Sequence, residues 1–181
     1  MFSDTLGIKV DTAPGINTRG DTRRLLTEGL YVHIAWEADP NDHSVFTVFP
    51  DDIEILEAYA NAVTAYYRAA MTTRSTDSPE FEEFLIDAEA MFGPAFAEAR
   101  NSGHVLDLGA GVVLRPYVIG DRRTDSAAVV YDCYLQDDSY VLSGEDKAGG
   151  DLLPKGQIVT LAKVDGRWKV DGASAGGSAC L

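Results

Sequence analysis

Residues 104–113 read HVLDLGAGVV, and the chain continues as LRPYVI. Gly109 and Gly111 favour a sharp bend, because glycine within a strand marks bulges and corners. The residues that follow are β-branched or aromatic, and Pro116 would break the interior of a helix. We therefore predict that residues 105–119 form one long strand bent at the two glycines. A helix after Gly111 would overturn this prediction.

The same ten residues resemble the first motif of class I methyltransferases, in which a strand and a glycine-rich turn meet S-adenosylmethionine. The resemblance would imply an S-adenosylmethionine-dependent enzyme. Such a turn needs a helix directly after it, with its N–H groups facing the ligand. Here valine occupies position 113 instead of a third small residue, and only about 70 residues follow, patterned as hairpins. A doubly wound sheet would alternate strands and helices, so the methyltransferase is kept as a remote alternative.

The clearest turn signal lies near the C-terminus, where residues 163–168 read KVDGRW. Asp-Gly between two alternating runs is typical of a two-residue type I′ hairpin. The turn predicts the pairs Val164–Arg167, Lys163–Trp168 and Leu161–Val170, with Val159, Leu161, Trp168 and Val170 on one face. The stem of Lys163 can then lie along Trp168. Earlier strands are predicted at residues 127–136, with Val129, Tyr131, Cys133 and Leu135 on one face, and at 140–142.

Helical periodicity and capping residues predict three helices ahead of these strands. The first has Asp51 as its N-cap, an acidic residue three positions on, and an end near Thr73. Its apolar stripe consists of Ile53, Leu56, Ala60, Val63, Tyr67 and Ala70, widened by Tyr59 and Tyr66. The second begins at Ser78-Pro79. Gly93-Pro94 interrupts it, and a short third helix stops at Gly103.

The first fifty residues differ from the rest of the chain. Proline and glycine over residues 11–21 indicate a loop. Residues 30–36 alternate as a strand, and residues 44–49 supply its partner in a hairpin. We therefore divide the chain into an N-terminal arm, residues 1–50, and a main domain, residues 51–181. The arm can pack on the main domain or on a second subunit.

The composition is that of a folded and strongly acidic chain. Its apolar content is 45% and its formal charge is −14, which fits one domain with a sizeable core. No cluster of Lys and Arg forms a basic stripe, so nucleic acid is not a predicted partner. No stretch approaches the roughly 20 apolar residues of a membrane span. Two cysteines and three scattered histidines lack metal-ligand spacing, so neither a metal nor another cofactor is predicted.

The order of helices, a long bent strand and hairpins ending in VDGRWKV resembles the NTF2-like superfamily, also described as cystatin-like or SnoaL-like. The likeness is to small actinobacterial members, often secreted or lipid-anchored, and covers residues 51–181. It rests on the final hairpin, the tyrosine- and alanine-rich first helix, Asp132-Cys133 on a middle strand, and Cys180 near the C-terminus. The resemblance implies an α+β fold whose N-terminal helices pack in a curved antiparallel sheet, the NTF2-like cone, preceded here by the arm.

The two cysteines leave the cellular compartment open. A bridge between Cys133 and Cys180 would tie the C-terminal tail to the sheet, and chain-entropy models assign it about 3–4 kcal/mol. The alternative is two unpaired thiols, one in the core and one at a frayed terminus. With the bridge we expect a cell-surface or secreted protein. Without it we expect a cytoplasmic one, because the chain begins with neither the basic nor the apolar part of a signal peptide.

Some relatives in the resembled superfamily use a His–Asp or Asp/Tyr pair for proton transfer. The corresponding candidates in this chain are weak, and they are Asp132, Tyr66, His104, Tyr67 and Asp87. Each also has a structural interpretation: the tyrosines as core or rim aromatics, Asp87 on a solvated helix face, Asp132 facing solvent or a turn, and His104 as a hydrogen-bonded strand residue. No catalytic residue is therefore assigned.

Three functions remain open from the sequence. The first is a non-catalytic NTF2-like domain for protein association or small-ligand binding, for example as one subunit of a larger surface assembly. The second is a SnoaL-like enzyme that moves protons on a hydrophobic small molecule. The third is the methyltransferase. The expected partners are a protein, a second copy of this chain, or a small hydrophobic ligand, because fold resemblance alone does not license an activity.

Overall fold

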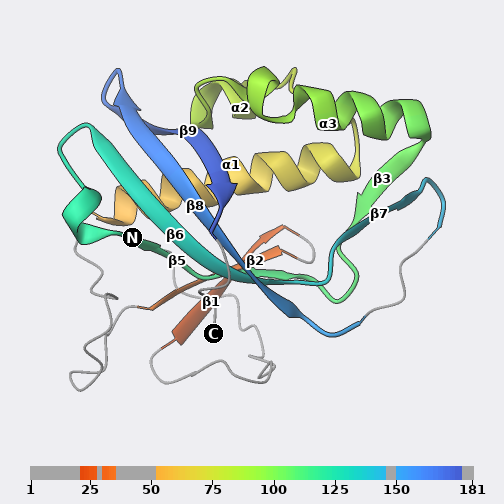
Figure 1. Cartoon of the computed structure of the whole chain (residues 1–181), viewed down its shortest axis with the longest axis horizontal. Coiled ribbons are helices and arrows are strands. Elements are labelled where there is room, and N and C mark those ends of the chain that lie inside the picture. The colour runs from red at the N-terminus through yellow and green to blue at the C-terminus, as the bar shows by residue number, and fades with distance from the viewer. Residues whose placement is uncertain (1–20, 28–29, 36–51, 146–149, 177–181) are drawn as a thin grey trace.

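The computed structural model describes residues 21–27, 30–35, 52–145 and 150–176. They form an α+β structure in which helices lie against a curved, mainly antiparallel sheet (Figure 1). The helices are α1 (Asp52–Met71), α2 (Pro79–Phe84) and α3 (Ala88–Ser102), with one 3-10 turn, η1 (Gly120–Arg122). The strands are β1 (Asp21–Thr27), β2 (Leu30–Ala35), β3 (His104–Asp107), β4 (Val112–Leu114), β5 (Pro116–Val118), β6 (Ala127–Gln136), β7 (Ser139–Leu142), β8 (Leu153–Val164) and β9 (Arg167–Ala175).

The main sheet has the strand order β1-β2-β4-β6-β8-β9, with β5 also paired to β6. The β2–β4 pair is parallel and the other pairs are antiparallel. Strands β3 and β7 form a separate two-stranded sheet. Helix α1 lies between the main sheet and the α2–α3 pair (Figure 1), and most of its residues are buried. A helix covered on both sides must be apolar nearly all round, which explains the many alanines of α1.

The HVLDLGAGVV stretch forms strands on both sides of a turn. The prediction of strand after Gly111 is confirmed by β4 and β5, and no helix follows the glycines. The prediction of one continuous strand is wrong, because β3 pairs with β7 in the second sheet and the chain turns before β4. The cause is Asp137, whose Oδ2 accepts hydrogen bonds from the backbone N–H groups of Ala110 (2.9 Å) and Gly150 (2.6 Å). Gly109 has φ +55°, and a Cβ there would lie 2.6 Å from Asp137.

The helices differ from the sequence prediction at one break. Ser78 caps α2 as predicted, and its side chain accepts from the N–H of Phe81. The predicted interruption at Gly93-Pro94 is wrong, because α3 runs through it and ends at Gly103, which has φ +73°. The break comes earlier because Ile86 donates its N–H to the carbonyl of Val170 on β9 (2.9 Å). Helix α1 ends at Met71, and the proposed cap Asp51 lies outside the described residues.

The C-terminal hairpin confirms the predicted register. Lys163 pairs with Trp168, and the pairs Val164–Arg167 and Leu161–Val170 also form. Asp165 and Gly166 both have positive φ, as a type I′ turn requires. The Lys163 ammonium lies 5.5 Å from the Trp168 ring centroid. The predicted apolar face, Val159, Leu161, Trp168 and Val170, is buried.

The N-terminal hairpin is built differently from the prediction. Strand β2 confirms the alternation from Leu30, but its antiparallel partner is β1, a segment reading DTRRLLT that shows no apolar alternation. The proposed partner, residues 44–49, lies outside the described residues. Strand β2 also pairs with β4, and Leu30 is fully buried in the core. This hairpin therefore packs on the main sheet and extends it.

Candidate functional site

Strand β6 places an aspartate inside the core. Its even-numbered residues face α1, and among them the Asp132 side chain is 0% exposed. The hydroxyl of Tyr59 on α1 donates to Oδ2 of Asp132 (2.5 Å), and the backbone N–H of Arg115 donates to Oδ1 (2.7 Å). The interpretation of Asp132 as a solvent-facing residue is wrong, because its side chain points toward α1 and is fully buried there.

A second contact completes a buried network. Gln157 on β8 is the register partner of Asp132 and donates its side-chain amide to the hydroxyl of Tyr59. Tyr59 therefore accepts from Gln157 while it donates to Asp132. We call Tyr59, Asp132, Gln157 and the N–H of Arg115 the buried network. It joins α1 to the neighbouring strands β6 and β8, and to the junction between β4 and β5.

Burial changes the proton affinity of this network. It raises the pKa of Asp132 to about 7, although the hydrogen bonds from Tyr59 and Arg115 act in the opposite direction. Burial, followed by the charge of Asp132, raises the pKa of Tyr59 well above its usual value. Loss of solvation disfavours the charged form of each group. Asp132 could thus hold a proton near neutral pH, but both of its oxygens already have protein donors.

A second group of tyrosines lies beyond this network, toward the C-terminal end of α1. We call Tyr66, Tyr67, Tyr134 and Tyr140 the tyrosine cluster; they come from α1, β6 and β7. The Tyr67 hydroxyl donates to Oδ2 of Asp138 (3.1 Å), and the hydroxyls of Tyr66 and Tyr140 lie 3.4 Å apart. The rings of Tyr66 and Tyr67 meet edge to face, with centroids 5.2 Å apart. Asp138 therefore lies beside the tyrosine cluster, at the junction of β6 and β7.

The electrostatics place Asp138 within reach of several of these rings. Burial raises the pKa of Tyr67, and the negative charge of Asp138 is the next cause. Burial also raises the pKa of Tyr134, followed by the charges of Asp138 and Asp132. For Tyr66 burial again comes first, then the contact with Tyr140. Tyr66, Tyr67 and Tyr134 are therefore neutral at physiological pH, and Asp138 places a negative charge beside them.

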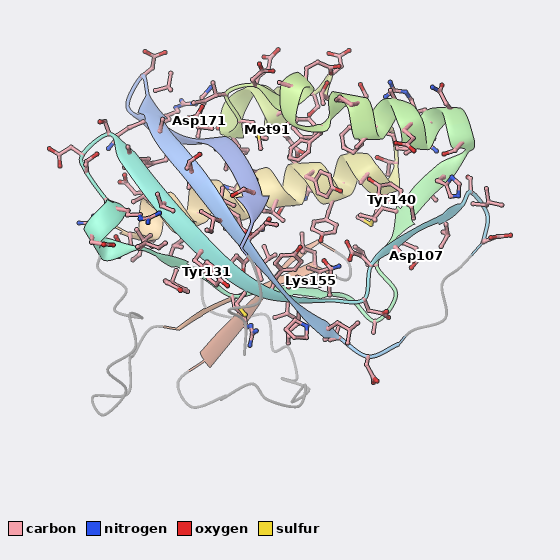
Figure 2. All side chains as sticks on the ribbon, viewed as in Figure 1. Met91, Asp107, Tyr131, Tyr140, Lys155 and Asp171 are labelled. Carbon is pink, nitrogen blue, oxygen red and sulfur yellow. The ribbon has the colours of Figure 1, made fainter. Side chains whose placement is uncertain are left out.

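The tyrosine cluster is open to solvent on one side. Tyr140 is 39% exposed and Leu142 is 47% exposed. Both residues share a face of the β3–β7 sheet with buried Leu106, because Leu106 is the register partner of Tyr140. Figure 2 shows Tyr140 labelled between β7 and α1. Apolar and phenolic surface is thus available at this end of α1, in contrast to the closed surroundings of Asp132.

The remaining sequence candidates lie apart from both groups. His104 begins β3, and its Nδ1 lies 2.7 Å from the hydroxyl of Ser102. Asp87 is the N-cap of α3 and accepts from the N–H of Ala90 (2.9 Å). The structure gives these two residues capping and turn contacts. It divides the other three, since Asp132 belongs to the buried network while Tyr66 and Tyr67 belong to the tyrosine cluster.

Sequence reasoning missed Tyr134, Asp138 and Gln157. Alternation along β6 could have placed Tyr134 on the same face as Asp132. Gln157 could have been found by extending the register of the C-terminal hairpin to the next pair of strands. Asp138 follows the strand as part of an Asp-Asp pair and carries no periodic signal, so only the packing of α1 reveals it.

Cys133 lies on the face of β6 opposite Asp132. It is disulfide-bonded, and its Sγ is 3.2 Å from Nη2 of Arg115. The proposed partner, Cys180, lies outside the described residues, so the pairing stays a prediction. Gly176 donates its N–H to Gly156, the register partner of Cys133 (2.8 Å). Four residues can span roughly 13 Å, so a cysteine at position 180 is within reach of Cys133.

Other kinds of site receive no support from the described ranges. They contain no group of three or more metal-ligating side chains. None of their helices combines the length and apolar character needed to cross a membrane. Comparison with protein-family models and with curated proteins finds no match for this chain. The candidate site is therefore defined by its geometry alone: a closed buried network around Asp132 and an open tyrosine cluster beside Asp138.

Proposed function

We propose that this chain is a non-catalytic NTF2-like domain that acts by binding a small hydrophobic ligand at the tyrosine cluster. The observation that carries the proposal is the open, partly apolar end of α1, where Tyr140 and Leu142 are both exposed. Tyrosines suit such a site because they combine a large apolar ring with a polar hydroxyl. A few polar groups among apolar walls are the usual composition of a ligand site.

The fold supports the NTF2-like part of the proposal at a coarse level. A long α1 lies against a curved antiparallel sheet, and the chain closes with the β8–β9 hairpin, as that superfamily would require. The added β1–β2 hairpin extends the sheet through β4. The tyrosine cluster lies toward the C-terminal end of α1, with Tyr134 from β6 and Tyr140 from β7.

The buried network supports a non-catalytic role. A general base must come within hydrogen-bond reach of the proton that it removes. Asp132 is fully buried, and its oxygens accept from Tyr59 and Arg115 instead. A closed polar network of this kind fixes one arrangement of helix and strands.

A fluorescent apolar probe tests the proposal. The folded protein should bind Nile red, a neutral apolar dye, and Leu142→Ser should weaken that binding. Ile86→Ser is the matched control, because Ile86 is similarly exposed at 44% but lies in the α2–α3 connection. Circular dichroism must show both variants folded. Equal loss of binding in the two variants, or no binding to the wild type, would contradict a ligand site at the tyrosine cluster.

The second candidate function is a SnoaL-like enzyme that moves protons on a hydrophobic small molecule. It is kept because the pKa of Asp132 is raised to about 7, and such shifts are frequent at catalytic sites. Exchange of an α-proton for deuterium on a hydrophobic ketone would reveal the activity, and Asp132→Asn should abolish it. Protein association would appear as a dimer or larger species in native mass spectrometry. Calorimetric titration with S-adenosylmethionine tests the remote methyltransferase alternative.

A further inference from the structure

We propose that the ligand of the tyrosine cluster carries a cationic ammonium group, held by the tyrosine rings beside the carboxylate of Asp138. This inference rests on the proposed function and names the chemical class of its ligand. Aromatic rings attract cations through their negative faces, and cages of several rings recognise quaternary ammonium groups. A nearby carboxylate adds Coulomb attraction that a neutral ligand would not feel.

The charge distribution favours a cation over an anion. Asp138 contacts Tyr67 directly, and its negative charge also acts on Tyr66 and Tyr134. Asp132 adds a second negative charge near Tyr134 when it is ionised. The whole chain carries a formal charge of −14. An anionic headgroup placed among these rings would therefore meet repulsion from the protein.

Basic side chains also lie near this region: Arg74 donates to the carbonyl of His104 at the start of β3 (2.9 Å), and Lys155 lies on β8. Lys155 is the register partner of Tyr134 on β8, and its side chain is exposed. A ligand anion would bind near Lys155, at the edge of the tyrosine cluster. A ligand cation would lie on the side of Asp138 and Tyr140, away from that ammonium. Removing the charge of Lys155 should thus weaken the binding of an anion and strengthen the binding of a cation.

The contact between the Tyr66 and Tyr140 hydroxyls is the longest in the tyrosine cluster, and we expect a ligand to enter there. The Tyr66 and Tyr140 hydroxyl oxygens are 3.4 Å apart, longer than the 2.7–2.8 Å typical of such bonds. Tyr66 is held in place by Phe92 and Phe96, with ring centroids 4.8 Å and 5.8 Å away. Tyr140 is the exposed partner on a short strand, so it is the ring that we expect to move when a ligand enters.

Choline and its neutral isostere 3,3-dimethyl-1-butanol are the probes, titrated against the whole protein by NMR. Choline should bind about tenfold more tightly, the scale of a partly desolvated cation–π contact. Asp138→Asn should remove most of that preference, and Lys155→Gln should raise choline affinity. Tyr140→Ala should weaken both probes. Tyr117→Ala should change neither, because the Tyr117 ring contacts that of Tyr131 on the outer face of the sheet, with centroids 5.5 Å apart.

The outcomes separate this inference from the proposed function. Equal affinity for the two probes would overturn the cationic ligand while leaving a hydrophobic site intact. Binding of Nile red that Leu142→Ser weakens, without any binding of choline, would do the same. If Asp138→Asn fails to fold, the salt dependence of the wild type decides instead. Choline affinity must then fall with added salt, and a salt-independent affinity would refute the role of the Asp138 charge.

Discussion

Substitution of Asp132 by asparagine should alter how the stability of this protein depends on pH. The pKa of Asp132 is raised from 3.8 to about 7 in the folded state. Between these values the folded chain binds more protons than the unfolded chain, so this group lowers the free energy of unfolding as pH rises. The free-energy cost of ionising Asp132 in the folded state is absent below about pH 4 and fully present above about pH 7. Three pKa units correspond to at most about 4 kcal/mol.

Asparagine can replace Asp132 without leaving the neighbouring polar groups unsatisfied. Its side-chain oxygen can accept from the Arg115 N–H, and its amide can donate to Tyr59. Tyr59 can then donate to the oxygen of Gln157, once that amide turns over. The variant should therefore remain folded, and it lacks the free-energy cost of ionising Asp132. Its free energy of unfolding should therefore rise relative to that of the wild type as pH rises.

Urea unfolding of both proteins at pH 4.5 and pH 8 measures the effect. The difference in free energy of unfolding, variant minus wild type, should shift in favour of the variant by up to about 3 kcal/mol between pH 4.5 and pH 8. Asp171→Asn on β9 is the control for replacing an exposed carboxylate by an amide. A pH-independent difference for Asp132→Asn would refute the assignment of a raised pKa to this carboxyl.

Gly109→Ala should destabilise the fold by more than Gly103→Ala in thermal unfolding, because both glycines have positive φ but only the first has protein oxygens 2.6 Å from the added Cβ; equal losses would contradict the close approach. Tyr59→Phe should cost about 1–3 kcal/mol in urea unfolding, since it removes the donor to Oδ2 of the buried Asp132 carboxyl. Tyr67→Phe should cost less and should mainly weaken binding of the probes. Intact mass under non-reducing conditions should show the Cys133 bridge as two missing hydrogens, and Cys133→Ser should lower stability by up to about 4 kcal/mol.

Local signals in the sequence predicted the strands and caps that depend on short-range chemistry. The Asp-Gly turn determined the β8–β9 register because the two-residue loop leaves only one pairing. Ser78 and Gly103 marked helix ends for the same reason, since a cap acts on its own first or last turn. These features could be predicted because no distant residue had to be known.

The errors came from long-range partners. Gly93-Pro94 did not break α3, because the break is made at Ile86 by the backbone of Val170 on β9. The long strand was divided at Gly109–Gly111 by the carboxylate of Asp137, which lies in a different part of the sequence. Strand β1 was missed because an edge strand needs no apolar alternation to pair with β2. In each case a tertiary contact overrode the local pattern.

The buried network and the tyrosine cluster share one feature: in each, a tyrosine of α1 donates to an aspartate on or just after β6. Tyr59 and Tyr67 lie eight residues apart on α1, which is about 12 Å along one face of a helix. Asp132 lies within β6 and Asp138 follows six residues later, between β6 and β7, so α1 can place a tyrosine on each carboxylate. The first pair is enclosed by sheet on both sides of β6, whereas the second lies at the end of the sheet next to exposed Tyr140. The same Tyr–Asp contact thus stabilises the fold at Asp132, and at Asp138 we propose that it also forms part of a ligand site.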